Sequence, residues 1–383
     1  MTAPAQRVLI APDSFKGSAT AAEVAAALAA GMRSVRGELA IRELPVADGG
    51  EGTVAAAVAA GWHEQVASVS GPLGHEVRAH YATAVVDGVA CAVVELAAAS
   101  GLPLSPADDD AARRASSRGT GELLAHAIDA GARRVVLGVG GSACTDGGAG
   151  MLVALGVQLL DHDGARLPDG GDALRRLATV DLAGLADRVG DVEIVLASDV
   201  DNPLLGPTGA AAVYGPQKGA DDRAVADLEA GLERWVDRLA AAGVVGATGV
   251  AERAGAGAAG GVGYAAMVLL GAVRRPGIDV VMELTGLGSA VADADLVVTG
   301  EGRIDEQSLR GKAPLGVAEL ARAAGVPVLL VGGGGGLAPD RLREHGIVGQ
   351  HLLTDIEPDV ARCIAHATLL LQDVGARIAR DHA

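Results

Sequence analysis

The chain has 383 residues, which is too long for one ordinary hydrophobic core and indicates two domains. Its formal net charge of −17 argues against binding nucleic acid or an anionic membrane surface, because both carry negative charge. Half of the residues are hydrophobic but only 2% are aromatic, so the core should be aliphatic, and no apolar run is long enough to span a bilayer.

The first 65 residues contain one pattern twice: a short strand, a polar or glycine-rich loop, and a helix. Residues 8–11 are predicted as a strand, and Thr20 is predicted to cap an alanine-rich helix that ends near Met32. A second strand at residues 41–44 leads into Asp48-Gly49-Gly50-Glu51-Gly52-Thr53 and another helix. This order is typical of a parallel sheet that binds ligands at the carboxyl ends of its strands.

The middle of the chain has a different pattern. Alternating apolar and polar residues at 66–95 predict antiparallel strands, joined by turns at residues 71–74 and at Asp87-Gly88. A buried strand is predicted at residues 134–139 and enters Gly140-Gly141-Ser142. Another strand at residues 193–197 ends in a polar run, and an amphipathic helix follows at residues 221–242.

The parallel pattern returns near Asp293. Strands are predicted at residues 296–298 and 327–331, the glycine run 332–336 is predicted as a loop, and residues 360–378 are predicted as one closing helix. We therefore expect an α/β protein of two domains. Residues 1–65 and 292–383 would form a discontinuous Rossmann-like domain with a parallel sheet, and residues 66–291 an inserted mixed α/β domain. The cleft between them is the expected site.

The lysines are few and share one setting. Only three of the 31 basic residues are lysines, and each lies beside a glycine in a polar stretch: Lys16, Lys218 and Lys312. An ammonium group is a compact, hydrated point charge that a planar guanidinium does not replace at a phosphate. The three lysines therefore predict one anionic site assembled from three loops, although lysine and glycine also favour exposed turns in general.

Acidic and amide side chains follow several of the predicted strands. In chain order they are Asp13, Asp48, Asp199, Asp201, Asn202, Glu301 and Asp305. Carboxylates at strand ends suit Mg²⁺, and a carboxylate can accept the proton of an attacking hydroxyl group. For any one of these acids, a helix cap or a turn is the alternative role.

Two other functional classes stay open. Gly138-Val139-Gly140-Gly141-Ser142-Ala143 follows a strand and matches a GxGxxA dinucleotide motif, with Asp161 near the spacing of a ribose-binding acid. An NAD(P)-dependent oxidoreductase of a small hydroxy acid is therefore the alternative function. A non-catalytic sensor of sugar acids or nucleotides is the third, although no basic patch or helix-turn-helix indicates a DNA-binding output.

The cysteines and the first residues favour a cytoplasmic protein. Cys91, Cys144 and Cys363 are odd in number and widely spaced, without a CxxC pair. Residues 1–7 lack the apolar region of a signal peptide. The reducing cytoplasm is the expected location.

Five motifs together resemble the bacterial glycerate kinase family. They are Ala11-Pro12-Asp13-Ser14-Phe15-Lys16-Gly17-Ser18, Asp48-Gly49-Gly50-Glu51-Gly52-Thr53, residues 198–206, Gly215-Pro216-Gln217-Lys218-Gly219 and residues 299–309. The resemblance runs in order from about Arg7 to the end of the chain. It implies two α/β domains and the ATP- and Mg²⁺-dependent phosphorylation of D-glycerate, commonly to 2-phosphoglycerate and otherwise to 3-phosphoglycerate. One departure is Ala143-Cys144-Thr145-Asp146, where the family typically has Ala-Thr-Asn-Asp.

The resemblance and the strand-end pattern together give a set of candidate site residues. The expected catalytic residues are Asp199, Lys16, Lys312 and Lys218. The expected substrate-binding residues are Asp13, Ser14, Asp48, Glu51, Asn202, Glu301, Arg303 and Asp305. The loop with Gly140, Gly141, Ser142, Asp146, Gly147 and Gly148 is expected to bind ATP phosphates at a helix N-terminus. Asp199 and Asp201 are expected to bind Mg²⁺, with the choice between base and metal ligand open at Asp199. The partners would be glycerate and ATP, with no nucleic acid or membrane, and an oligomer is left open.

Overall fold

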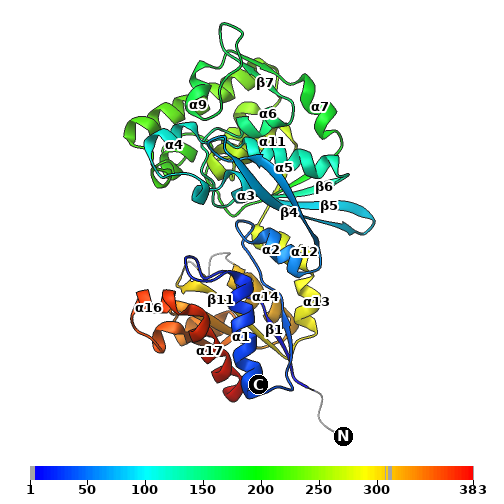
Figure 1. The fold of residues 1–383 in the computed structure, drawn as a ribbon, viewed down its shortest axis with the longest axis vertical. Helices are drawn as coiled ribbons and strands as arrows, with labels where there is room; N and C mark the ends of the chain where they lie inside the picture. Colours follow the sequence, from blue (N-terminus) through cyan, green and yellow to red (C-terminus); the bar gives the residue numbers. More distant parts are fainter. Residues whose placement is uncertain (1–4, 307, 309–312, 383) are drawn as a thin grey trace. The chain divides into compact units, whose positions relative to one another are not determined.

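The structure is a computed structural model that describes residues 5–306, 308 and 313–382 (Figure 1). Its contacts divide the chain into two compact units. We call residues 1–48, 55–61 and 276–383 the terminal unit, and residues 49–54 and 62–275 the central unit. These limits differ from the expected boundaries at residues 66 and 292, and the domain division made from the sequence stays a prediction.

The terminal unit contains a parallel sheet in the order β13-β12-β11-β1-β2. Its strands are β1 (Arg7–Ile10), β2 (Ala40–Glu43), β11 (Leu296–Ile304), β12 (Val328–Gly335) and β13 (Ile347–Leu352). The chain adds β2 on one side of β1 and adds β12 and β13 on the far side of β11. The strand order therefore reverses between β1 and β11, which is where open α/β sheets bind ligands. The predicted α/β class is confirmed.

Helices cover both faces of this sheet. One face carries α1 (Ala21–Val35) and α17 (Ala367–Asp381), which lie side by side (Figure 1). The other face carries α12 (Gly277–Thr285), α13 (Leu287–Ala292), α14 (Ala313–Ala324) and α15 (Pro339–Glu344). A Cβ at Gly31 in α1 would overlap the carbonyl oxygen of Gln372 in α17, so glycine permits the close approach of these two helices. The predicted cap is confirmed, because Thr20 and Glu23 form a capping box at the start of α1.

Two predictions in this unit are wrong. The glycine run was expected to be a loop, but β12 continues to Gly335 because its backbone pairs with β11 as far as Ile304. A Cβ at Gly333 would overlap the carbonyl oxygen of Gly302, so the pairing of these strands itself requires glycine. The single closing helix is two helices, α16 (Val360–Ala365) and α17, and Asp359 caps the first of them.

The central unit contains a mixed sheet in the order β10-β9-β6-β5-β4-β3. Its strands are β3 (His63–Ser70), β4 (Glu76–Val86), β5 (Val89–Glu95), β6 (Arg134–Gly138), β9 (Glu193–Ala197) and β10 (Val273–Arg275). The predicted antiparallel hairpins are confirmed for β3, β4 and β5. Asp87 and Gly88 both have positive φ, as the tight turn between β4 and β5 requires. The remaining strands of this sheet pair in parallel.

The other elements surround this sheet or connect its strands, except α2, most of which belongs to the terminal unit. The helices are α2 (Thr53–Ala59), α3 (Ala97–Ser100), α4 (Asp109–Arg114), α5 (Arg118–Asp129), α6 (Ala149–Ala154), α7 (Ala183–Val189), α8 (Ala210–Tyr214), α9 (Asp222–Ala241), α10 (Ala247–Ala251) and α11 (Val262–Leu269). A small separate hairpin consists of β7 (Gln158–Leu160) and β8 (Thr179–Asp181). The fully buried Trp235 of α9 and Tyr264 of α11 belong to the core of this unit. Among the described residues, no helix is long and apolar enough to cross a membrane.

Candidate active site

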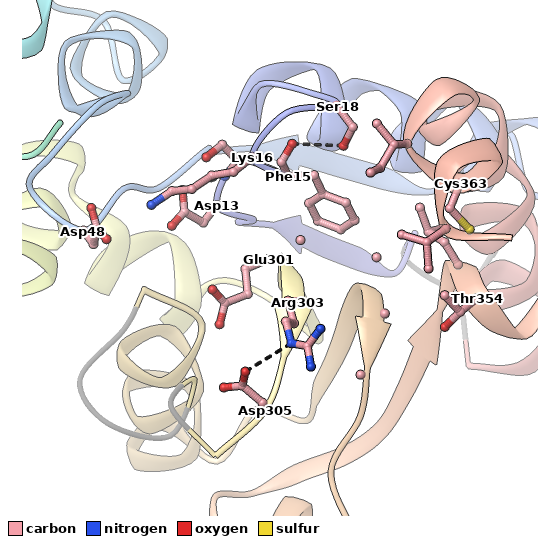
Figure 2. A pocket seen from close by; sticks show the side chains of 18 residues that line it. Asp13, Phe15, Lys16, Ser18, Asp48, Glu301, Arg303, Asp305, Thr354 and Cys363 are labelled. Atoms are coloured by element: carbon pink, nitrogen blue, oxygen red, sulfur yellow. Dashed lines mark hydrogen bonds and ion pairs between the residues drawn. The ribbon is translucent and has the colours of Figure 1, made fainter. Parts of the chain in front are cut away.

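A cavity of about 450 Å³ lies at the carboxyl ends of β1, β11 and β12 in the terminal unit (Figure 2). Backbone and side-chain hydrogen bonds hold the ends of β1 and β11 together. The Asp13 amide donates to the carbonyl oxygen of Gly300 at 2.8 Å, and the Thr299 hydroxyl donates to that of Ala11 at 2.7 Å. The cavity therefore opens at the point where the strand order of the sheet reverses.

One end of this cavity is charged. It contains Asp13, Ser14, Lys16, Asp48, Glu301, Arg303 and Asp305, all of which were predicted as site residues from the sequence. Figure 2 shows Asp13 and Lys16 on the loop after β1, and Glu301 and Arg303 on β11. The Arg303 Nε lies 3.4 Å from Oδ2 of Asp305. Four carboxylates and two cations thus meet within one cavity, although they lie far apart along the chain.

Asp13 has the most perturbed environment at this end. Its side chain is buried, and its Oδ1 accepts a hydrogen bond from the Ser14 amide at 2.6 Å. Burial raises the pKa of Asp13 to about 7, and the neighbouring carboxylates of Asp48 and Glu301 add to the rise. The Ser14 amide and the Lys16 ammonium group partly oppose it. Asp13 therefore gains or loses its proton near neutral pH, which suits a group that exchanges protons with a ligand.

A tight turn presents Lys16 to the cavity. The Phe15 amide donates to the carbonyl oxygen of Ala19, the Ser18 hydroxyl donates to that of Phe15, and Gly17 adopts a φ of +80°. The N-terminus of α1 is already closed by its capping box. The positive charge available at this position is therefore that of the exposed Lys16 in the turn, and not that of the N-terminus of α1.

The other end of the cavity is apolar, and the sequence analysis missed it. It is lined by Phe15, Leu353, Val360, Cys363 and Ile364, together with the backbone of residues 333–335. Phe15 offered a signal, because it is the only phenylalanine of the chain and stands beside Lys16. The others come from α16 and from η5 (Leu353–Asp355), and no local pattern links them to the site.

The third predicted lysine cannot be placed in this cavity. Lys312 lies outside the described residues, and its assigned role stays a prediction. The other predicted residues of the terminal unit are those at the charged end of the cavity.

The remaining candidates belong to the central unit, where several follow the parallel strands β6 and β9. Residues 49–51 cross the start of the loop after β6: a Cβ at Gly138 would lie 2.5 Å from the carbonyl oxygen of Gly49, and one at Gly140 would lie 2.7 Å from Cα of Gly50. Glu51, in the crossing segment, is exposed, as is Gly141, whereas Ser142 is buried. The glycines of the loop are therefore needed for the crossing of two backbone segments.

Asp146 occupies the position that was expected to hold a phosphate. It is fully buried, and its carboxylate accepts hydrogen bonds from the amides of Ser117 at 2.8 Å and of Gly148 and Gly150 at 3.1 Å. Burial raises the pKa of Asp146, and these donors oppose the rise. The Gly147 amide donates to the carbonyl oxygen of Gly260. The amides of Gly147 and Gly148 are thus engaged within the protein, and phosphate binding by Gly140, Gly141 and Ser142 stays a prediction.

Lys218 supports this loop from inside the protein. It lies in η3 (Pro216–Lys218) and is only 2% exposed. Its Nζ donates to the carbonyl oxygen of Cys144 at 2.5 Å and lies 3.4 Å from Oγ1 of Thr145. Burial lowers the pKa of Lys218, while the neighbouring Cys144 and Asp146 oppose that change. In this arrangement Lys218 positions the loop, and its predicted direct contact with a ligand stays untested.

The acids after β9 face solvent. Asp199 and Asp201 are exposed, and Oδ1 of Asp201 lies 2.6 Å from Nη2 of Arg274. Asn202 is held by two hydrogen bonds: its amide group donates to the carbonyl oxygen of Thr208, and its side-chain oxygen accepts from the Tyr214 hydroxyl. Among the described residues, no group of three or more His, Cys, Asp or Glu side chains is arranged to hold a metal ion.

Glu95 is a further acidic residue that the sequence analysis missed. It ends β5, is buried, and accepts a hydrogen bond from the Val54 amide at 2.5 Å. Burial raises the pKa of Glu95 to about 7, although the amides of residues 52–54 oppose the rise. Its place at a strand end was a signal that would have found it. Glu95 fixes the segment that crosses the loop after β6.

The dinucleotide motif is explained without a dinucleotide. Gly138 and Gly140 are required by the crossing of residues 49–51, as their neighbours show. Asp161 was the expected ribose ligand, but its Oδ1 accepts hydrogen bonds from the amides of Asp163 and Ala165 and so stabilises a turn. The oxidoreductase alternative is therefore not favoured.

Comparison with known proteins gives one consistent result. The sequence profile of the glycerate kinase family matches residues 8–383. The chain is 47% identical over 344 residues to a glycerate kinase of Bacillus subtilis (strain 168), which covers 89% of this chain and 88% of the relative. It is 44% identical over 346 residues to the glycerate 2-kinase of Escherichia coli (strain K12). That match covers 90% of this chain and 88% of the relative.

The fold comparison agrees. A crystal structure from Salmonella typhimurium LT2, provisionally named glycerate kinase 2, superposes with a TM-score of 0.82 at 40% identity and covers 98% of both chains. Carboxylates and a lysine gather where an α/β sheet binds ligands, and the family match extends over nearly the whole chain. This protein is therefore a kinase that belongs to the glycerate kinase family.

Proposed function

We propose that this chain transfers the γ-phosphoryl group of ATP to a hydroxyl group of D-glycerate, with Mg²⁺, and forms 2-phosphoglycerate in the cytoplasm. The observation that carries the proposal is the family match from residue 8 to residue 383. The Escherichia coli relative is named a glycerate 2-kinase, which supports the 2-position over the 3-position. Both relatives are covered over 88% of their own length, so the comparison concerns most of each enzyme.

In the terminal unit, Lys16 is proposed to bind an anionic group of the reactants. It is exposed and lines the cavity, and its ammonium group can neutralise a carboxylate or phosphate oxygen. Ser14, Arg303 and the carboxylates of the charged end are proposed to orient substrate through hydrogen bonds. Phosphoryl transfer depends mainly on such positioning and on neutralising charge, because the transition state is loose.

In the central unit, Asp199 is proposed to act as the base or as a metal ligand. It is exposed at the end of β9, beside Asp201 and Asn202. Mg²⁺ commonly takes only one or two protein carboxylates and completes its shell with water and phosphate oxygens, so Asp199 and Asp201 suffice as a donor set. Bound there, the ion would neutralise negative charge on the phosphate groups. The ion pair with Arg274 restrains the Asp201 side chain and so limits its ability to bind Mg²⁺.

The first test is an assay of the purified chain with D-glycerate, ATP and Mg²⁺ that reads ADP release. ADP release that requires glycerate and stops on addition of EDTA is the expected result. Phosphorus NMR of the product then distinguishes 2-phosphoglycerate from 3-phosphoglycerate. A folded protein that releases no ADP with glycerate would reject this substrate.

The role of Asp199 has its own test. Asp199→Asn should lower kcat by two orders of magnitude or more, since a general base contributes about 10²- to 10⁴-fold. Its melting temperature should stay that of the wild type, because the side chain is exposed. Near-normal turnover in this variant contradicts both roles proposed for Asp199.

A further inference from the structure

We propose that the apolar end of the terminal-unit cavity binds the adenine ring of the nucleotide, against the free edge of β12. This inference rests on the proposed ATP-dependent function and assigns one part of the nucleotide to one place. Three observations carry it: the size of the cavity, the character of its walls, and the exposed edge of the strand.

The size and the walls exclude glycerate as the occupant of the apolar end. A cavity of about 450 Å³ is within the range of pockets that hold drug-sized ligands, and glycerate has only three carbons. The carboxylate and hydroxyl groups of glycerate have no partner among Phe15, Val360 and Ile364. A planar heterocycle gains from contact with an aromatic ring and aliphatic side chains.

The edge of β12 supplies the polar groups that a purine ring needs. β13 pairs with β12 only from Val328 to Gly332, so no strand of the described chain lies beside residues 333–335 on that side. These residues line the cavity with backbone alone. Amide and carbonyl groups of an unpaired strand edge can exchange hydrogen bonds with the edge of a base, as they would with another strand.

Gly334 is where a side chain would enter the cavity. A Cβ built at Gly334 meets only Thr354, with its Cγ2 at 3.2 Å, and Thr354 also lines the cavity. The backbone of Gly334 is within a strand and does not require a positive φ, so a side chain here has to displace only the side chain of Thr354 slightly. A larger side chain at position 334 would therefore take up cavity space beside Thr354.

The two ends of the cavity fit the two parts of a nucleoside. Figure 2 shows Phe15, Thr354 and Cys363 at one end and Lys16, Asp48, Glu301 and Asp305 at the other. Ribose hydroxyl groups donate readily to carboxylates. With four carboxylates and two cations, the charged end does not by itself attract a triphosphate, so the base and the sugar must contribute much of the binding.

The first test uses Gly334→Val in the full chain, with Gly288→Val as the matched control. Gly288 is an exposed glycine of α13, in the same unit, with nothing within 4 Å of a built Cβ. Calorimetry with adenosine, ADP and inorganic pyrophosphate should show at least tenfold weaker binding of adenosine and ADP to Gly334→Val. Binding of pyrophosphate, and all binding to Gly288→Val, should match the wild type.

A second pair of variants leaves strand β12 unchanged. Ile364→Gln replaces a side chain of α16 that is 48% exposed and lines the cavity, and Leu369→Gln replaces one of α17 that is 61% exposed and does not line it. Only Ile364→Gln should raise the KM for ATP, by several fold, without raising the KM for glycerate.

The outcomes separate this inference from the proposed function. Wild-type binding of adenosine and ADP to Gly334→Val, together with a wild-type KM for ATP in Ile364→Gln, overturns the assignment. A rise in the KM for glycerate alone, or a loss of pyrophosphate binding equal to that of ADP, also overturns it. If the wild type fails to phosphorylate glycerate, the proposed function fails, and adenosine binding still decides whether the apolar end holds a nucleoside.

Discussion

Lys16 in the terminal unit and Lys218 in the central unit have the same local sequence but opposite environments. Each precedes a glycine with positive φ, Gly17 at +80° and Gly219 at +98°. Lys16 is exposed and lines a cavity, whereas Lys218 is 2% exposed and donates to the backbone of the loop after β6. A lysine beside a glycine therefore indicates a place where positive charge is needed. The pattern does not show whether the ammonium group contacts the protein itself or a ligand.

The largest effect is expected for removing the exposed lysine. Lys16→Met should lower kcat/KM by about 10³-fold, comparable to the loss of one group that stabilises a transition-state oxyanion. Its stability should change by less than about 0.5 kcal/mol, because exposed charges contribute little. Steady-state kinetics and thermal unfolding measured on the same preparation check both expectations. A large loss of stability in this variant would show that Lys16, like Lys218, is needed by the folded structure.

The buried lysine should show the reverse pattern. Lys218→Met keeps most of the side-chain volume but leaves the buried Asp146 without its positive neighbour, and we expect a loss of about 3 kcal/mol in unfolding free energy. Trp62 and Trp235 both lie in the central unit, so their fluorescence during urea unfolding reports on this unit. Lys16→Met is the control. Unchanged stability would mean that Lys218 is not needed by the loop, and its direct role in catalysis would regain support.

A titrating acid separates the two sites further. Because burial raises the pKa of Asp13 from 3.8 to about 7, the folded protein holds this proton more tightly than the unfolded chain does. The resulting stabilisation of the folded state is fully present below about pH 4. That stabilisation is lost as the pH rises to about 7, since the unfolded chain ionises first. Asp13→Asn should therefore be more stable than the wild type by about 4 kcal/mol at pH 8, and equal to it near pH 4.

Calorimetric unfolding at the two pH values measures this difference. The same substitution should also remove any step near pH 7 from the pH profile of kcat/KM. A stability difference that does not change between pH 4 and pH 8 contradicts a raised pKa at Asp13.

The smallest effect is expected at an exposed ion pair of the central unit. Arg274→Gln releases Asp201, but because the Asp201 side chain is 80% exposed, the loss of stability should be under about 1 kcal/mol. If Asp201 binds Mg²⁺, its release from Arg274 should lower the concentration of Mg²⁺ needed for half-maximal activity. A higher requirement for Mg²⁺ would show that Arg274 holds Asp201 in its working position.

Much of the fold could be predicted because its signals are local. The strand at β1, the cap at Thr20 and the turn at Asp87-Gly88 each depend on side chains within a few residues. The glycine run at the end of β12 was mispredicted because its strand exists only through pairing with β11, whose residues lie far away in sequence. Propensity is a weak guide where such pairing decides the structure.

The sequence by itself determined the α/β class, several of the strands, and the acids and lysines that follow them, because periodicity, turn chemistry and capping act over short distances. The tertiary structure decided which of those charges meet a cavity. It placed Asp13, Lys16 and Glu301 together and buried Lys218 and Asp146. It also built the apolar end from Phe15 and two distant helical segments. Burial and electrostatic environment arise from packing between remote parts of the chain, and no local pattern encodes them.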